Sequence, residues 1–510
     1  MSEGPVVETA YGRVRGRSEA GLAVFRGIPF SAPVSGARRF APPAAPARWP
    51  GVRDALRLGL TAPQSSDALL DRLGLFPTGA QGEGALTLNV WTRGCDGARR
   101  PVLVWIHGGG FQSGSGSLAL YDARRLARRG DVVVVTLDYR VGALGFLELA
   151  AVAGFEGASN LGLLDQIAAL RFVREHAEAF GGEPSRITAF GESAGAGSLL
   201  ALLAMPAAQG LFARAIVQSA APDGVIDRES AHERTARFAA KLGVAPDRLR
   251  EIPLDALLEV QRQLALEGPW KMDMPFVPVV DGATLPRAPV AAIAAGAGAG
   301  VELVIGTTDD EMRLYAYLEP PDSISEPEAL RRLAFELPAI APAGCAAGDA
   351  APVYEAFRGL RKAQGAPHAP ADLLWAIQTE LRLHYHSIEI ARLRAARGER
   401  TFVYRFGWRS PDQHGWLGAC HAIDLPFTFG NLDAPGMASF AGAGPAAAAL
   451  SRDWMDAICA FARSGDPSHA AIGSWPAYDL ARQPTLGFAA ERALLEAPGE
   501  AERRALAPFL

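Results

Sequence analysis

The chain has 510 residues, of which 49% are hydrophobic and 21% are charged, and this composition supports a large buried core and excludes an intrinsically disordered protein. Its 50 basic and 55 acidic residues give a formal net charge of -5, with no block of like charge to attract nucleic acid or an anionic membrane. We therefore expect a globular protein that binds neither nucleic acid nor membrane.

The N-terminal segment, MSEGPVVETAYGRVRG, lacks the basic and apolar regions of a secretory signal, and no apolar run reaches the roughly 18 residues of a membrane span. These features predict a soluble, cytoplasmic protein, although a chain from which a signal had been removed would look the same. Four cysteines, Cys95, Cys345, Cys420 and Cys459, show no C-x-x-C spacing and are sparse for a disulfide scaffold. We expect them to be free thiols.

Six short apolar runs predict strands, at residues 101–107, 131–139, 185–190, 213–220, 301–307 and 401–406. Most are continuously apolar rather than alternating, which fits strands buried on both faces of a mainly parallel sheet. Between the second and the third run, apolar residues at steps of three and four from Leu163 to Phe180 predict a helix that Gly181 and Gly182 end. This alternation of strands and helices predicts an α/β fold.

Two segments, about 221–300 and 318–398, replace the strand pattern with charged helical patterns and Pro/Ala-rich loops. We interpret them as helical insertions that roof the sheet. The Ala/Gly-rich stretches 291–300 and 440–451 predict surface loops or short helices. Length alone leaves the number of domains open.

The first candidate site residue is Ser193, in the sequence FGESAG at 190–195. It follows the strand predicted at 185–190 and precedes a small, apolar segment that can form a helix until Pro206. The G-x-S-x-G turn has this setting, and it exposes a serine hydroxyl near the positive end of a helix dipole. The alternative is an N-cap serine with neighbouring glycines.

A second motif, HGGGF at 107–111, directly follows the apolar run PVLVWI. Three glycines allow a sharp turn and expose adjacent N–H groups, as an oxyanion hole requires. A glycine-rich phosphate loop is the alternative, but the lysine and Ser/Thr of a Walker sequence are missing. Two such motifs, each at the end of a predicted strand, favour nucleophilic catalysis by serine.

A serine nucleophile needs a histidine base, and the base needs an acid that holds its tautomer. With the chain order nucleophile, acid, histidine, the candidate bases are the histidines after Ser193: His232, His368, His384, His386, His414, His421 and His469. His384 and His386 lie in a predicted amphipathic helix, and we interpret them as structural. His421, in the irregular segment GACHAIDLPFTFG, is the favoured base, with His414 in the same loop as its rival.

The acid is predicted in the segment IGTTDDE at 305–311, directly after the strand predicted at 301–307. It offers Asp309, Asp310 and Glu311, and the residues alone do not choose among them.

These motifs together resemble the type-B carboxylesterases, the α/β-hydrolase family that also contains the cholinesterases. The resemblance runs nearly end to end, through FRGIPFSAPVSGARRFAPP, LTLNVWT, WIHGGGFQSGSG, VVVTLDYRVGALGFL, SNLGLLDQIAALRFVREHAEAFGG, ITAFGESAGAGS, AIVQSA, PFVPVVDG, VIGTTDDE and GACHAIDLPFTFG. It implies the α/β-hydrolase fold, with a large, mostly parallel central sheet flanked by helices. It also implies one domain over residues 1–510, with the two helical insertions above the active site.

The resemblance assigns roles by motif: Ser193 as nucleophile, Glu311 as acid, His421 as base, and the N–H groups of Gly109, Gly110 and Ala194 as oxyanion donors. Glutamate is the acid of this family, which selects Glu311. The implied function is hydrolysis of small-molecule carboxylic esters through an acyl-enzyme intermediate, without metal or cofactor, by a monomer or small homo-oligomer. The alternatives are a catalytically silent binding protein, and an amidase or specialised detoxifying esterase.

Other matched positions have lesser roles. Asn160, Asp165 and Gln166 match residues that serve the fold, and Ser219 matches a serine that lies near the triad in relatives. Trp270, Met272 and Phe276 are candidates to line an acyl or alcohol pocket, with core packing as the alternative.

The chain also departs from the family pattern. Relatives often carry a disulfide where this chain has Ala62-Pro63-Gln64 and Glu83-Gly84-Ala85-Leu86, and both cysteines are absent here, as a reduced compartment permits. We expect the loop that this disulfide would close to be more mobile.

Overall fold

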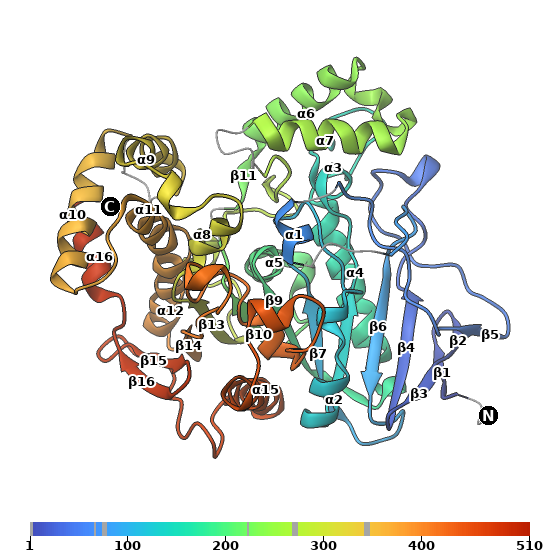
Figure 1. The fold of residues 1–510 in the computed structure, drawn as a ribbon. Coiled ribbons are helices and arrows are strands. Elements are labelled where there is room, and N and C mark those ends of the chain that lie inside the picture. The colour runs from blue at the N-terminus through green and yellow to red at the C-terminus, as the bar shows by residue number, and fades with distance from the viewer. Residues whose placement is uncertain are drawn as a thin grey trace.

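In the computed structural model, which describes residues 4–65, 68–73, 79–221, 224–267, 274–340 and 347–509, eleven strands form one central sheet (Figure 1). In spatial order the strands are β16 (Arg492–Glu496), β15 (Pro484–Phe488), β14 (Thr401–Phe406), β13 (Glu302–Thr308), β10 (Arg214–Gln218), β9 (Gly182–Glu192), β7 (Arg100–Ile106), β8 (Val133–Leu137), β6 (Thr87–Thr92), β4 (Leu22–Pro29) and β3 (Arg17–Glu19). Neighbours from β8 to β15 pair in parallel, and the pairs towards both edges are antiparallel.

All six predicted strands are present, and their continuous apolar pattern has a simple cause. Alternate side chains of a strand point to opposite faces, and in β7 both faces are covered. Val102, Val104 and Ile106 belong to one buried cluster, whereas Leu103 and Trp105 belong to a second on the other face. The predicted α/β fold with a mainly parallel sheet is therefore confirmed.

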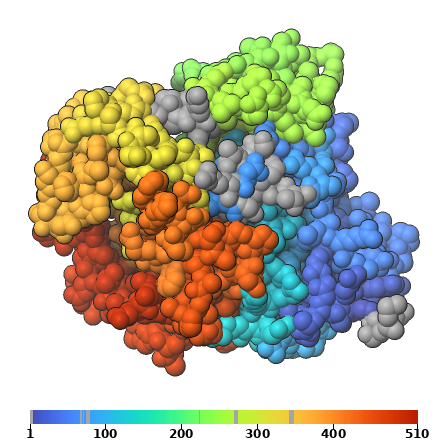
Figure 2. All heavy atoms as spheres, viewed as in Figure 1, coloured from blue at the N-terminus to red at the C-terminus, as the bar shows by residue number. Residues whose placement is uncertain are grey.

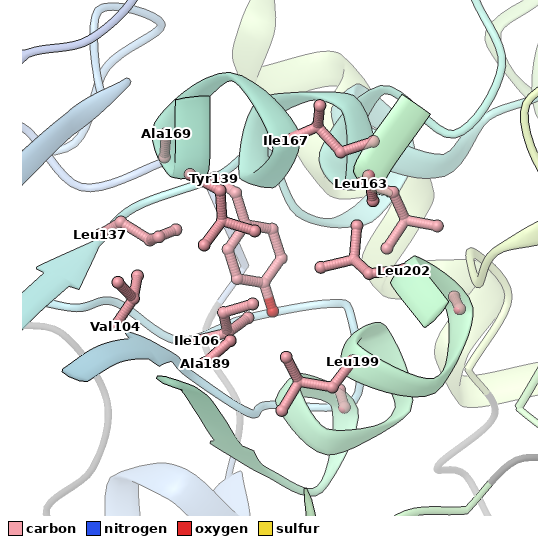
Figure 3. Packing of buried hydrophobic residues seen from close by; sticks show 14 of the residues in the cluster. Val104, Ile106, Leu137, Tyr139, Leu163, Ile167, Ala169, Ala189, Leu199 and Leu202 are labelled. Carbon is pink, nitrogen blue, oxygen red and sulfur yellow. The ribbon is translucent and has the colours of Figure 1, made fainter. Parts of the chain in front are cut away.

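One face of the sheet packs against α4 (Leu161–His176) and α5 (Ala194–Ala204). The helix predicted from Leu163 to Phe180 corresponds to α4 and the short 3-10 turn Ala177–Phe180 that follows it. Figure 3 shows how these elements meet: side chains from β7, β9, α4 and α5 surround the ring of Tyr139. The apolar stripe of α4 thus faces the sheet, as its spacing predicts.

The opposite face is covered by α2 (Arg124–Gly130) and α15 (Pro445–Ser464). The prediction of a surface loop or short helix over 440–451 was wrong, because α15 has 20 residues and Ala447, Leu450 and Ser451 are buried in it. Alanine has the highest helix propensity, and its small side chain lets the helix pack closely. None of the described helices, α15 included, is long and apolar enough to cross a membrane.

The segments predicted as insertions are mainly helical. The first contains α6 (Arg228–Leu242), α7 (Leu254–Glu267), α8 (Pro289–Ala294) and a two-stranded pair of β11 (Ile226–Asp227) and β12 (Val279–Val280). The second contains α9 (Glu326–Ile340), α10 (Ala350–Ala363), α11 (Pro370–Thr379), a π-helical turn (Glu380–His384) and α12 (Tyr385–Ala396). The green α6–α7 region and the yellow α9 region lie along one end of the molecule (Figures 1 and 2).

The remaining elements are short. They are the strands β1 (Val6–Thr9), β2 (Gly12–Arg15) and β5 (Val52–Asp54), which form a separate small sheet, and the helices α1 (Ala68–Leu73), α3 (Gly142–Phe146), α13 (Leu425–Phe429), α14 (Met437–Phe440) and α16 (Glu500–Leu506). The sequence patterns did not single out these strands, nor the edge strands β3 and β16 and the inner strands β4, β6 and β15 of the central sheet. Short edge strands bury fewer side chains, so their apolar signal is weak.

Hydrogen bonds and an ion pair hold the two stretches where relatives often carry a disulfide. Gln64 Nε2 donates to the Gly114 carbonyl, and Gln81 accepts from the Gln64 N–H. Arg39 forms an ion pair with Glu83, at 2.6 Å. Part of the loop between these stretches lies outside the described residues, as does Cys345; of the described cysteines, Cys95, Cys420 and Cys459 are free thiols.

The loop after β8 is anchored to α4 by a buried ion pair. Arg140 donates from Nε and Nη2 to the two carboxylate oxygens of Asp165, each at 2.8 Å, and from Nη1 to the Ala41 carbonyl. The side chains of Arg140 and Asp165 are 4% and 0% exposed. Removing one charge from such a pair leaves the other buried and uncompensated, so Asp165 serves the fold.

We predict that Asp165→Asn lowers the free energy of unfolding by about 3–5 kcal/mol, the usual cost of breaking a buried pair. Guanidinium unfolding of the purified variant would measure it. Glu500→Gln removes the carboxylate of the exposed Arg504–Glu500 pair and should cost less than about 1 kcal/mol. Equal losses in the two variants would contradict the anchoring role of Asp165.

Candidate active site

Ser193 occupies a sharp turn between β9, which ends at Glu192, and α5, which begins at Ala194. Its backbone has φ 57° and ψ -124°, a conformation that costs free energy in a residue with a Cβ. The Ser193 N–H donates to the Gln218 carbonyl on β10, at 2.9 Å, and the Ser193 carbonyl accepts from the Gly197 N–H, at 2.8 Å. The predicted strand, turn and helix are therefore present, and neighbouring elements hold the strained turn.

The glycines beside Ser193 allow α5 to approach β7. A Cβ added at Gly195 would lie 2.1 Å from the Ile106 carbonyl oxygen, and one at Gly191 would lie 2.8 Å from the same atom. Neither distance is sterically allowed. Any larger residue at Gly195 would push the start of α5, and Ser193 with it, away from the sheet.

The HGGGF loop lies against this turn. A Cβ added at Gly108 would lie 3.0 Å from the Cβ of Ser193, so the two motifs of the sequence are in contact. Tyr139 stacks on His107, with ring centroids 4.3 Å apart, and its hydroxyl donates to the His107 carbonyl. These contacts fix the loop at its start.

Three N–H groups near Ser193 are available to a ligand. The N–H groups of Gly109 and Gly110 donate to no other residue within the described ranges, and both glycines have positive φ, 112° and 61°. Ala194 is the first residue of α5, where N–H groups have no acceptor inside the helix. The predicted oxyanion donors thus lie on two adjacent elements and carry free N–H groups.

Glu311 and His421 lie in contact although they are 110 positions apart in the sequence. Nδ1 of His421 lies 2.6 Å from Oε2 of Glu311, and the His421 N–H donates to the Glu311 carbonyl, at 3.0 Å. Burial would raise the pKa of Glu311, but His421, the Ser219 hydroxyl and the Thr308 N–H together hold this pKa below its usual range. Glu311 is therefore an ionised acceptor for His421.

The alternatives weighed from the sequence occupy other places. Asp309 pairs with Arg405, at 3.6 Å, and Asp310 accepts from the Ala419 N–H, at 3.0 Å. His414 is exposed, and its ring packs edge-on against Trp416. Within the described residues neither aspartate contacts His421, whereas Glu311 does.

Of the predicted pocket residues, Phe276 is 2% exposed and packs edge-on against Phe238, which makes it a core residue. Trp270 and Met272 lie outside the described residues. Met274, which no sequence motif indicated, is 40% exposed, and its sulfur would lie 3.1 Å from a Cβ added at Gly110. It therefore stands over the glycine loop beside Ser193.

Glu192, the residue before Ser193, is a further residue of the site that was not predicted from the sequence. Nε2 of His421 lies 3.0 Å from Oε1 of Glu192, while Ser193 Oγ makes no hydrogen bond within the described part of the chain. Burial raises the pKa of Glu192 to about 8. A carboxylate within a small, apolar stretch was the available signal, because such a group is buried only where a partner exists.

The two carboxylates act on the protonation of His421. Burial lowers the pKa of this imidazole, but Glu192 and Glu311 more than offset the effect and raise it to about 9. His421 then becomes a neutral base only as the pH rises through that value.

We predict that Glu192→Gln lowers the pKa of His421 by about 1 unit or more, because one of the facing carboxylates is neutralised. Titration of the imidazole signals by NMR, with His421→Gln to assign the resonance, would measure it. Glu148→Gln is the matched control, because Glu148 is also buried but accepts from Ser159. If the pKa of His421 is the same in the parent protein, in Glu192→Gln and in Glu148→Gln, Glu192 has no influence on it.

Comparisons with known proteins show what the chain is similar to. The chain matches the carboxylesterase family over residues 3–503. Para-nitrobenzyl esterase from Bacillus subtilis (strain 168) is 37% identical over 99% of this chain and 98% of its own length, and phenmedipham hydrolase from Pseudarthrobacter oxydans is 37% identical over 93% of each. A Geobacillus stearothermophilus carboxylesterase structure at pH 6.2 aligns with a TM-score of 0.86 and 39% identity, over 98% of this chain and 99% of that chain.

Proposed function

The chain belongs to the carboxylesterase family and is a carboxylic ester hydrolase, and from this premise we propose that Ser193, His421 and Glu311 are its catalytic triad. The distance that carries the proposal is the 2.6 Å between Glu311 and His421. The strained turn at Ser193, in contact with a loop of free N–H groups, supports it further.

In the proposed mechanism, His421 takes the proton of Ser193 as the hydroxyl oxygen attacks the ester carbonyl. The N–H groups of Gly109, Gly110 and Ala194 stabilise the oxyanion. His421 then gives the proton to the leaving alcohol, and an acyl-enzyme remains. Water, activated by His421, releases the acid and restores Ser193, while the ionised Glu311 stabilises the imidazolium that forms in each half-reaction.

In this mechanism Nε2 of His421, which lies 3.0 Å from Glu192, has to accept a hydrogen bond from Ser193. Catalytic hydrogen bonds are often long or unformed in a protein without substrate and tighten in its complex. The side chain of His421 is 21% exposed, so part of it is accessible from solvent. Glu192 is then the group that holds the resting imidazole.

We further propose that residues 1–510 form one α/β-hydrolase domain, with the insertions at 221–300 and 318–398. The central sheet takes strands from both ends of the chain, which supports this division. The substrates are small-molecule esters. We propose p-nitrobenzyl esters among them, on the likeness to para-nitrobenzyl esterase, and a cytoplasmic monomer or small homo-oligomer that uses no metal or cofactor.

Ser193→Ala should lower the turnover of p-nitrophenyl and p-nitrobenzyl esters by about 10⁴-fold or more, since the nucleophile is lost. It should also abolish covalent labelling by an organophosphate, followed by mass spectrometry. Ser198→Ala is the matched control, because Ser198 is a buried serine on α5 that accepts from Gln166; it should keep turnover near that of the parent. Retained turnover in Ser193→Ala would refute the proposal.

His421→Ala should lower kcat by about 10⁴-fold, as removal of a triad base does. His414→Ala should change kcat little, because His414 is exposed and its ring packs against Trp416. Steady-state kinetics on one ester would compare them. A larger loss in His414→Ala would reassign the base.

A further inference from the structure

A second carboxylate–imidazole pair lies behind Glu311, on the π-helical turn between α11 and α12. Nδ1 of His384 lies 3.1 Å from Oε2 of Glu380, and Nε2 of His384 lies 2.8 Å from the Thr308 carbonyl oxygen. His384 is 6% exposed and Glu380 is 2% exposed. The pair is thus buried, and it contacts the end of β13, the strand that leads to Glu311.

Thr308 joins this pair to the acid. Its carbonyl faces His384, and its N–H donates to Oε1 of Glu311, at 2.8 Å. Met312, the residue after Glu311, is also held by a residue next to the π-helical turn. Its N–H donates to the hydroxyl oxygen of Thr379, at 3.1 Å. The turn that carries Glu311 is therefore bound on both sides by residues 379–384.

The hydrogen bonds require a particular protonation of the pair. A carbonyl oxygen only accepts, so Nε2 of His384 is a donor. Burial would raise the pKa of Glu380, but the bond from His384 and the charges of Arg405 and Arg503 hold it below its usual range. Glu380 is then an ionised group beside His384.

The pair also lies beside a cavity. It lines a cavity of about 130 Å³, to which Asp309 and Arg405 also contribute. A cavity of this size and polarity can hold water. π-helical turns inside helices are rare and frequent at functional sites, in line with a role beyond packing.

We propose that His384, held by Glu380, is a positioning residue for the acid: it fixes Thr308 so that the Thr308 N–H stays directed at Glu311. The inference rests on the proposed role of Glu311. If Thr308 shifts, Glu311 loses one hydrogen bond to its ionised form and stabilises the His421 imidazolium less well. The chemistry itself stays with Ser193, His421 and Glu311.

The test compares His384→Leu with His384→Gln, using rates per site titrated with an organophosphate. His384→Leu should lower kcat by about 10- to 100-fold, the effect of one hydrogen bond to a charged group, with little change in KM. It should also move the acidic limb of the kcat/KM profile to lower pH, because a poorly held Glu311 raises the pKa of His421 less. Glutamine can still donate to the Thr308 carbonyl, so His384→Gln should recover most of kcat.

His176→Leu is the matched control. His176 is a histidine on α4 that is 5% exposed, accepts from the Ala10 N–H and contacts the Phe172 carbonyl. Its removal should lower thermal stability and leave kcat and the pH profile unchanged. If His384→Leu behaves in the same way, His384 is only structural and the proposal is wrong.

Two further variants separate the possible failures. If Glu311→Gln keeps full turnover, the proposed function itself fails; if Glu311→Gln loses turnover but His384→Leu does not, only the role of His384 fails. Should His384→Leu not fold, Glu380→Gln decides instead. This variant keeps the side-chain shape and removes the charge. It should shift the acidic limb of the kcat/KM profile to lower pH, and an unshifted limb would refute the positioning role of the Glu380–His384 pair.

Discussion

An ionised carboxylate at Glu311, fully buried between the sheet and the loop that carries His421, is the constraint around which the proposed site is arranged. A buried carboxylate without partners would take up a proton and could no longer hold an imidazolium. Here the Thr308 N–H and the His421 imidazole each bind one of its oxygens. Because these partners come from the end of β13 and from a distant loop, the acid depends on the correct assembly of both.

The parallel sheet supplies that assembly. Carboxyl ends of parallel strands meet at one edge, which is where open α/β sheets bind ligands. The glycine loop follows β7, Ser193 follows β9, and Glu311 follows β13. The continuous apolar strands, buried on both faces, make this edge rigid, so that a strained backbone at Ser193 is maintained by packing.

Carboxylates surround His421 on more than one side. Glu311 lies at Nδ1 and Glu192 at Nε2, and the charge of Asp424 adds to theirs. Such an environment favours the imidazolium, which is the state that a general base passes through during acyl transfer. The same charges raise the pH at which the His421 imidazole becomes neutral. They therefore make the imidazole a stronger base but lower the fraction of enzyme in which it is neutral.

Much of the fold and part of the site could be predicted from local sequence. The strands, the α4 stripe and the two glycine motifs are local patterns, because apolar runs, helical spacing and turn residues can be recognised from residues close in the chain. The choice of Glu311 and His421 needed tertiary structure, or a family resemblance, since these residues are 110 positions apart and Asp309, Asp310 and His414 have the same chemistry. Glu192, Met274 and the Glu380–His384 pair were missed, and α15 was misjudged, because burial and partners arise only when distant elements pack together.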